Sequence, residues 1–152
     1  MAVEALSGTT SSELVWDAAR RATAFTDPGQ PIKVAGLDGW APEGILAAGV
    51  AASIMTRFLD LAAAAHLEVL GYVSRQRALL RPLPEGPDLE ISPCIVVSSE
   101  EAASRARSLF ETAVAEAPSV RALRRFPAVD ATYTVVRDPR DLINTPGWRA
   151  RA

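Results

Sequence analysis

The sequence predicts an α+β protein with a single domain at residues 13–137, between a flexible N-terminal segment at 1–12 and a polar tail at 138–152. Three observations carry this prediction. The 152 residues are 49 % hydrophobic and 22 % charged, a composition that supports a globular core rather than disorder. Helical and extended stretches alternate in the order β-β-α-β-β-α-(α)-β. No segment repeats and no change of composition marks a linker, so one domain accounts for the chain.

The first part of the chain predicts a hairpin followed by a long helix. Residues 13–26 alternate weakly between apolar and polar, an Asp-Pro-Gly turn signal follows at 27–29, and 31–37 returns as a strand. Pro42 suits the first position of a helix, which we expect to run to His66.

The second part predicts two strands, an amphipathic helix and a closing strand. Extended stretches at 67–80 and 88–98 flank the proline-rich turn RPLPEGP. Ser98 and Glu101 have the spacing of a capping box, and Pro118 limits the helix that follows. Apolar residues line one face of that helix, which must therefore lie on a core: Ala102, Ala106, Leu109, Phe110, Ala113, Val114 and Ala117. The remaining elements are a short helical turn and a strand, at 119–126 and 128–136.

The long helix expected at 42–66 is small or apolar on every side through three turns. Such a helix has to be covered all round. One modest sheet and one other helix would cover only part of it, so we expect a second copy of the chain to supply the rest. The sequence therefore predicts a homodimer.

Charge and cysteine content exclude several classes of protein. A net charge of −2 gives no general attraction for nucleic acid or an anionic membrane. The apolar run from Gly44 to Met55 is too short to span a bilayer before Arg57 and Asp60 interrupt it. Cys94 is the single cysteine, which excludes an internal disulfide framework and a cysteine-based metal cluster. We expect a cytoplasmic protein without a metal or a cofactor.

The residues that could carry chemistry do not form a complete active site. Ser53 would need a base, and the single histidine, His66, lies roughly 20 Å away along one helix at 1.5 Å per residue. A hydrogen bond from the Ser53 hydroxyl to a carbonyl one turn earlier is the expected structural role. Cys94 lies in the apolar run ISPCIVV without a helix start or a nearby cation, so we expect it to be buried and inert. His66 has no second histidine at ligand spacing, which favours a capping or surface position.

Two segments, in the right order and with the expected strands between them, resemble the OsmC/Ohr family. Members of this family are bacterial thiol peroxidases that reduce organic hydroperoxides. APEGILAAGVAASI at 41–54 is similar to the family pattern N-P-E-x-L-x-A-A-x-x-x-x-C-F. ARSLFETAVAEAPSVRAL at 106–123 is similar to its helix ending in C-P before a small or polar turn. The likeness runs from about Trp16 to Val136.

The resemblance implies a fold and a set of site positions. The family fold is an intertwined homodimer, in which antiparallel sheets from both chains wrap around the long central helices. Its chemistry uses a peroxidatic cysteine on that helix, a resolving cysteine at the C-P position, and a glutamate and an arginine that activate the first thiol. Glu43 matches the glutamate, Ser53 stands at the peroxidatic position and Ala117 at the resolving position.

The chain departs from the family pattern at further positions. The loop at 27–40 holds no arginine, and Arg20 or Arg21 from the first strand are the alternatives that the sequence leaves open. Ile54 replaces the aromatic residue of the motif, and Glu116 precedes the resolving position. These changes beside the two lost cysteines favour natural divergence over replacement by an experimenter.

The functional expectation is a non-catalytic homodimer whose former active site holds a small apolar ligand. Glu43, Ser53, Met55 and Ala117 are the expected ligand-binding residues. A serine hydroxyl cannot replace the thiolate that attacks a peroxide O–O bond. Three alternatives stay open: a peroxidase of the same family that uses Cys94 or another group, a hydrolase that uses Ser53 with Glu43, and a purely structural or partner-binding dimer.

Overall fold

The computed structural model describes residues 12–18, 21–26, 29–34, 39–79, 88–123 and 125–138. They belong to two compact units, Met1–Ile45 and Leu46–Ala152. The predicted flexible segment and the predicted tail lie almost wholly outside the described residues, and the predicted domain boundaries stay a prediction.

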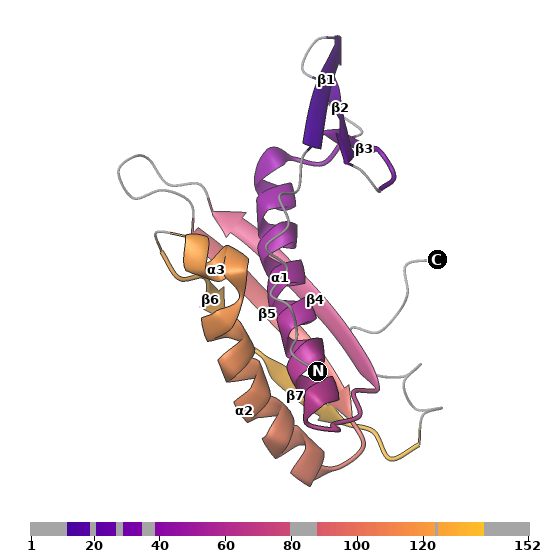
Figure 1. Cartoon of the computed structure of the whole chain (residues 1–152), viewed down its shortest axis with the longest axis vertical. Helices are drawn as coiled ribbons and strands as arrows, with labels where there is room; N and C mark the ends of the chain where they lie inside the picture. Colours follow the sequence, from indigo (N-terminus) through magenta and orange to yellow (C-terminus); the bar gives the residue numbers. More distant parts are fainter. Residues whose placement is uncertain are drawn as a thin grey trace. The chain divides into compact units, whose positions relative to one another are not determined.

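The first unit holds a three-stranded antiparallel sheet, in the order β1-β2-β3. Its strands are β1 (Ser12–Ala18), β2 (Arg21–Thr26) and β3 (Ile32–Val34) (Figure 1). The segment expected to be one strand of a hairpin at 13–26 is thus two strands. Large apolar side chains of this unit are exposed, namely Phe25 at 43 %, Ile32 at 40 % and Trp40 at 55 %.

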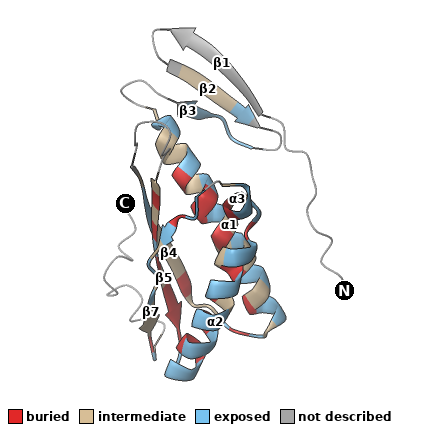
Figure 2. Ribbon diagram, turned by 90° about the vertical axis from the view of Figure 1, so that its left-hand side faces the viewer, coloured by how far each residue is buried: buried red, intermediate tan, exposed pale blue. Residues whose placement is uncertain are grey.

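The second unit packs helices on one face of a mixed sheet (Figure 2). β4 (Gly71–Leu79) pairs with β5 (Asp88–Val97) in antiparallel register over its full length. β6 (Ala128–Val129) and β7 (Thr132–Val135) both pair with β5 in parallel. The helices are α1 (Pro42–Ala64), whose first turn belongs to the first unit, α2 (Glu100–Glu116) and α3 (Pro118–Ala122).

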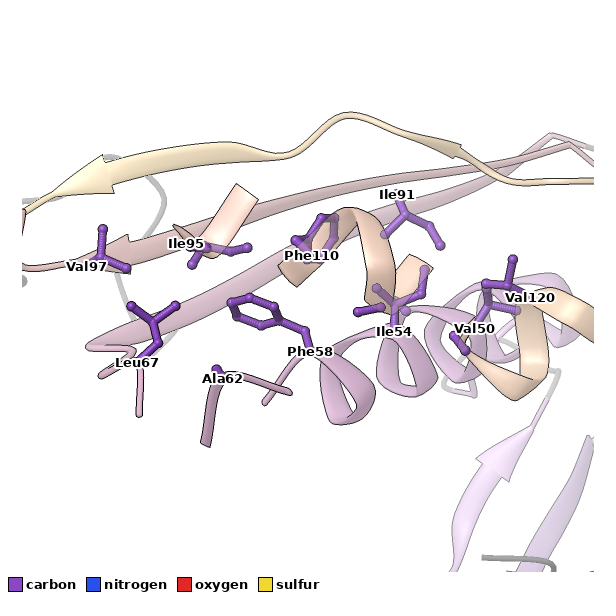
Figure 3. Close-up of a cluster of buried hydrophobic side chains, with 14 of the residues drawn as sticks. Val50, Ile54, Phe58, Ala62, Leu67, Ile91, Ile95, Val97, Phe110 and Val120 are labelled. Atoms are coloured by element: carbon purple, nitrogen blue, oxygen red, sulfur yellow. The ribbon is translucent and has the colours of Figure 1, made fainter. Parts of the chain in front are cut away.

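The core of the second unit lies between β5 and the inner faces of α1 and α2. Alternate residues of β5 point toward the helices and are buried, as the pleat of a strand requires: Leu89, Ile91, Pro93, Ile95 and Val97. Phe58 of α1 sits at the centre of this cluster (Figure 3). Its ring contacts Phe110 of α2 edge-on at 5.6 Å between centroids, and Tyr72 of β4 at 6.1 Å. The apolar stripe predicted for α2 is confirmed, with Leu109 and Val114 at its half-buried margin.

The structure moves three predicted boundaries. Ser99, not Ser98, caps α2, because its backbone is extended and its hydroxyl accepts the N–H of Ala102 at 3.1 Å. α1 ends at Ala64, two residues before the expected end, because His66 has a φ of 53°. The closing strand expected at 128–136 is divided into β6 and β7.

Helix α1 is 23 residues long and contains an 18-residue stretch with a mean hydropathy of 1.6, so by length and composition alone it could cross a membrane. The apolar run counted in the sequence was shorter because it stopped at Arg57. Six of its residues are buried in the core of the second unit: Ala47, Val50, Ala51, Ile54, Phe58 and Ala62. The central helix of a folded domain can be as long and as apolar as a membrane-spanning helix, and these buried residues make α1 a core helix.

The face of α1 that points away from this core is exposed and apolar. Leu46 is 42 % exposed and Leu59 is 38 % exposed. Small residues lie between and beside them at helical spacing, all of them exposed: Gly49, Ala52, Thr56 and Ala63. The described part of the chain therefore covers one side of α1 and leaves the other side exposed.

Candidate functional site at Ser53

Ser53 lies in the middle of α1 and is half-buried. Its hydroxyl oxygen accepts a hydrogen bond from the backbone N–H of Ser119 at 3.3 Å. We expected the Ser53 hydroxyl to bond to a carbonyl one turn earlier. In α1 it is Thr56 that makes a bond of this type, donating its hydroxyl to the carbonyl of Ala52 at 2.9 Å. The Ser53 hydroxyl thus serves a distant segment of the chain rather than its own helix.

The local sequence explains why the Ser119 N–H needs this acceptor. Ala117 leaves the helical region with a ψ of 124°, ends α2 and occupies the N-cap position of α3. Its methyl side chain cannot accept a hydrogen bond, and Pro118 at the first position has no N–H. The next N–H in the first turn of α3 is that of Ser119, which has no partner within its own helix. Ser53 supplies the oxygen that a serine or aspartate at the N-cap would otherwise supply.

A second polar contact joins α1 to the last residue of α2, next to the turn that leads into α3. The Arg57 side chain donates from Nε at 2.9 Å and from Nη2 at 2.5 Å to one oxygen, Oε2, of Glu116. Arg57 follows Ser53 by one turn of α1, and Glu116 is the last residue of α2. Their side chains are 32 % and 46 % exposed, so water and salt weaken the charge component of this contact.

The position matched to the resolving cysteine, Ala117, lies two residues before Ser119, the hydrogen-bond partner of Ser53. Ala117 is fully buried. Met55 is half-buried on the same helix. Glu43 lies in the first turn of α1, within the first unit, so its place beside Ser53 stays a prediction.

The place of the two candidate arginines stays a prediction. Arg20 and the side chain of Arg21 lie outside the part of the chain whose contacts the structure describes. The arginine beside Ser53 is Arg57, and Glu116 already binds its guanidinium group.

The remaining candidate residues lie elsewhere. Cys94 is half-buried rather than buried, and it lies on the sheet face opposite the helices. Its sulfur lies 3.5 Å from the Thr134 hydroxyl on β7. His66 is exposed, just beyond the end of α1, where Arg105 of α2 donates to the carbonyl of Ala65 at 2.6 Å.

The described arrangement around Ser53 is suited to holding segments of the chain together. Within the described ranges, no histidine or carboxylate accepts the proton of the Ser53 hydroxyl, so that part of the chain supplies it with no general base. Nor do three metal-ligating side chains gather anywhere in that part of the chain.

Comparisons with known proteins bear on the fold. No family model matches the sequence, and no curated protein matches it. Solved structures do match. An OsmC-like protein of unknown function from Vibrio cholerae aligns with 83 % of this chain and 99 % of its own, at a TM-score of 0.70 and 16 % identity. An organic hydroperoxide resistance protein from Elizabethkingia anophelis, with bound thiocyanate, aligns with 88 % of this chain and 99 % of its own, at a TM-score of 0.65 and 19 % identity.

A third structure, of an organic hydroperoxide resistance protein from Legionella pneumophila, aligns with 87 % of this chain and 100 % of its own, at a TM-score of 0.62 and 22 % identity. The chain has the OsmC-like fold. At 16 to 22 % identity these likenesses establish the fold and leave the activity of the OsmC-like chain to be argued from its own residues. The single cysteine of the sequence, Cys94, lies at neither matched position.

Sequence reasoning missed Arg57 and Ser119 as members of the site. The spacing of Ser53 and Arg57, four residues on one helix, places both on one side of α1 and could have indicated Arg57. The pair Ala117-Pro118 could have indicated Ser119, because neither residue can satisfy the first N–H of the helix that follows. Which oxygen would accept that N–H depends on the tertiary packing of α1, which no local pattern contains.

Proposed function

We propose that this OsmC-like protein is a non-catalytic, cytoplasmic homodimer. The observation that carries the proposal is the hydrogen bond from the Ser119 N–H to the Ser53 hydroxyl, at the position matched to the peroxidatic cysteine. Attack on a peroxide needs a thiolate, and a hydroxyl without a base is not ionised at neutral pH. Cys94 cannot take over in place, because it faces the side of the sheet away from α1.

The dimer part of the proposal is supported by apolar surface in both units. In the second unit, α1 exposes Leu46, Leu59 and the small residues between them. In the first unit, Phe25, Ile32 and Trp40 are exposed on or beside a sheet of three strands. The buried hydrophobic residues of the described chain begin at Ala47. Surface of this kind in both units is what an intertwined dimer would bury.

A small apolar ligand is a separate part of the proposal. Ser53 and Met55 are half-buried, so each keeps some surface that a small apolar molecule could cover. Native mass spectrometry of the purified protein tests this part. An adduct that disappears on denaturation supports a ligand, and a spectrum with the bare dimer alone contradicts it.

A hydroperoxide assay tests the catalytic part. Cumene hydroperoxide consumption with a dithiol reductant is measured for the wild type and for Cys94→Ala, with an active organic hydroperoxide resistance protein as the positive control. We expect both forms of this chain to match the rate without protein. Wild-type turnover that is lost in Cys94→Ala would overturn the proposal in favour of a peroxidase that works through that thiol.

A further inference from the structure

The contacts at Ser53 and Arg57 join the same two segments of the chain, α1 and the turn between α2 and α3. We propose that they act together as a non-covalent clasp, which keeps this turn closed on α1. The clasp consists of two contacts: the N–H of Ser119 to the Ser53 hydroxyl, and the Arg57 guanidinium group to the Glu116 carboxylate. This inference does not depend on the dimer or on the absence of catalysis.

The turn between α2 and α3 needs such a contact because its own backbone stabilises it weakly. Two backbone hydrogen bonds hold the turn, and both are made by Ala117. Its N–H donates to the carbonyl of Ala113, and its carbonyl accepts the N–H of Arg121. α3 is five residues long and has no side-chain cap of its own. A helix this short is not stable by itself, so tertiary contacts must hold it.

Apolar contact lies between the two polar contacts of the clasp. Ala117 is fully buried, and Val120 of α3 is 1 % exposed beside Val50 and Ile54 of α1 (Figure 3). Val120 cannot leave this cluster unless the turn lifts away from α1. Lifting the turn separates Ser119 from Ser53, and Glu116 from Arg57, in the same movement. The two polar contacts therefore open together, and each one makes the other easier to form.

Amide hydrogen exchange at Ser119 tests the clasp. The structure gives this N–H one acceptor within the described chain, the Ser53 hydroxyl. Losing a hydrogen bond of this kind, with a net contribution of about 1 kcal/mol, predicts roughly fivefold faster exchange at Ser119 in Ser53→Ala. Thr56→Ala is the matched control, since Thr56 lies on the same helix and its hydroxyl bonds within that helix. The control should leave Ser119 unchanged.

Glu116→Gln tests whether the two contacts act together. Glu116 does not touch Ser119, yet its replacement should speed exchange at Ser119 several-fold, because the ion pair no longer helps to hold the turn down. The double variant should exchange more slowly than the product of the two single effects predicts. Exchange at amides of β5, in the core, separates this local opening from a general loss of stability.

Each result bears on the proposal. Faster exchange at Ser119 in both single variants, with unchanged β5 amides and a less than multiplicative double variant, would support the clasp. Unchanged exchange in Ser53→Ala would show that the hydroxyl does not hold the turn. Unchanged exchange in Glu116→Gln, or a fully multiplicative double variant, would show two independent contacts and overturn the clasp.

Discussion

Ser53 shows at the scale of one residue what a sequence can and cannot say. A hydroxyl among alanines, isoleucine and methionine in an apolar helix predicts a hydrogen bond made locally. In the structure the hydroxyl instead accepts a hydrogen bond from the N–H of Ser119, which lies far along the chain. The sequence indicated Ser53 and the segment near Ala117 as candidate positions, but not the contact between Ser53 and Ser119, because this contact exists only once α1 and α3 have packed together.

The first prediction concerns the end of α1. The N–H of His66 bonds to the carbonyl of Ala63 at 3.1 Å, and the N–H of Leu67 to that of Ala62 at 2.8 Å, a pairing that places His66 at the left-handed position after the helix. Glycine is the residue best suited to that position. His66→Gly should raise the free energy of unfolding by about 1 kcal/mol, measured by urea denaturation.

His66→Val serves as the opposite change, since a β-branched residue tolerates a positive φ poorly, and it should be less stable than the wild type. If His66→Gly were less stable than the wild type, the exposed imidazole would have to make a stabilising contact that outweighs the backbone strain.

A second prediction tests whether positions 53 and 117 can hold a working thiol pair. We expect Ser53→Cys/Ala117→Cys to form a disulfide on treatment with cumene hydroperoxide, because Ser53 already contacts the residue two positions beyond Ala117. The first thiolate takes one peroxide oxygen to give a sulfenic acid and an alcohol. The second thiol then displaces water to form the disulfide. Titration should then detect one free thiol per chain, that of Cys94.

Ser53→Cys is the control and should stop at the sulfenic acid, trapped with dimedone. Turnover of the double variant should stay well below that of an active family member, because the loop at 27–40 supplies no arginine to lower the thiol pKa. A double variant that keeps all its thiols after peroxide would show that the two positions are misplaced.

At the scale of elements, the strongly patterned segments were predictable and the irregular ones were not. The apolar run of α1 and the stripe of α2 are long enough for their period to decide the type of element. The break between β6 and β7 carries no such signal, since AVDATYTVV reads as one extended stretch. Their parallel pairing with β5 could not be predicted, because it depends on where α2 returns the chain.

Strand β4 gives the third prediction. Among the described residues, the hydroxyls of Tyr72 and Ser74 are buried without a hydrogen-bond partner, both on the side of the strand that faces the helices. Burying a polar group without a hydrogen-bond partner lowers the free energy of unfolding by about 1–3 kcal/mol. Removing the Tyr72 hydroxyl should therefore not destabilise the protein. Tyr72→Phe should be as stable as the wild type or more stable at pH 7, by thermal unfolding. A marked loss of stability would mean that the assembled protein supplies a partner for this hydroxyl.

Alkaline pH provides the fourth prediction, at the same residue. Burial, with a smaller contribution from Tyr133, raises the pKa of Tyr72 above its ordinary value of 10.0. The unfolded chain therefore releases this proton at lower pH than the folded chain does. The stability that Tyr72 contributes is complete below pH 10 and falls as the pH rises further. Tyr72→Phe should lose less stability between pH 9 and about pH 11 than the wild type does.

Tyr133→Phe is the comparison for this measurement. The pKa of Tyr133 is also raised, chiefly by burial, but Arg107 above its ring opposes the shift. Replacing Tyr133 should change the alkaline profile less than replacing Tyr72. Equal profiles for Tyr72→Phe and the wild type would show that other groups govern alkaline unfolding.

At the scale of the whole molecule, the described core covers one side of the central helix. The inner side of α1 meets β5 and α2 around Phe58, whereas Leu46 and Leu59 lie on the open side. The sequence alone indicated this imbalance, because a helix that is apolar all round requires more cover than one sheet and one helix offer. The identity of what covers the open side is a question about assembly, which periodicity in one chain cannot answer.

The last prediction therefore concerns assembly. Sedimentation at micromolar concentration should give twice the chain mass of 16.2 kDa for the wild type. Leu59→Arg places a charge on the open side of α1, where a second copy would have to bury it at a high cost in free energy, and should shift the protein toward monomer. Ser108→Arg, on the exposed face of α2, is the matched control and should leave the dimer intact. A wild type that sediments as a well-folded monomer, or a Leu59→Arg variant as dimeric as its control, would rule out the open face of α1 as the dimer contact.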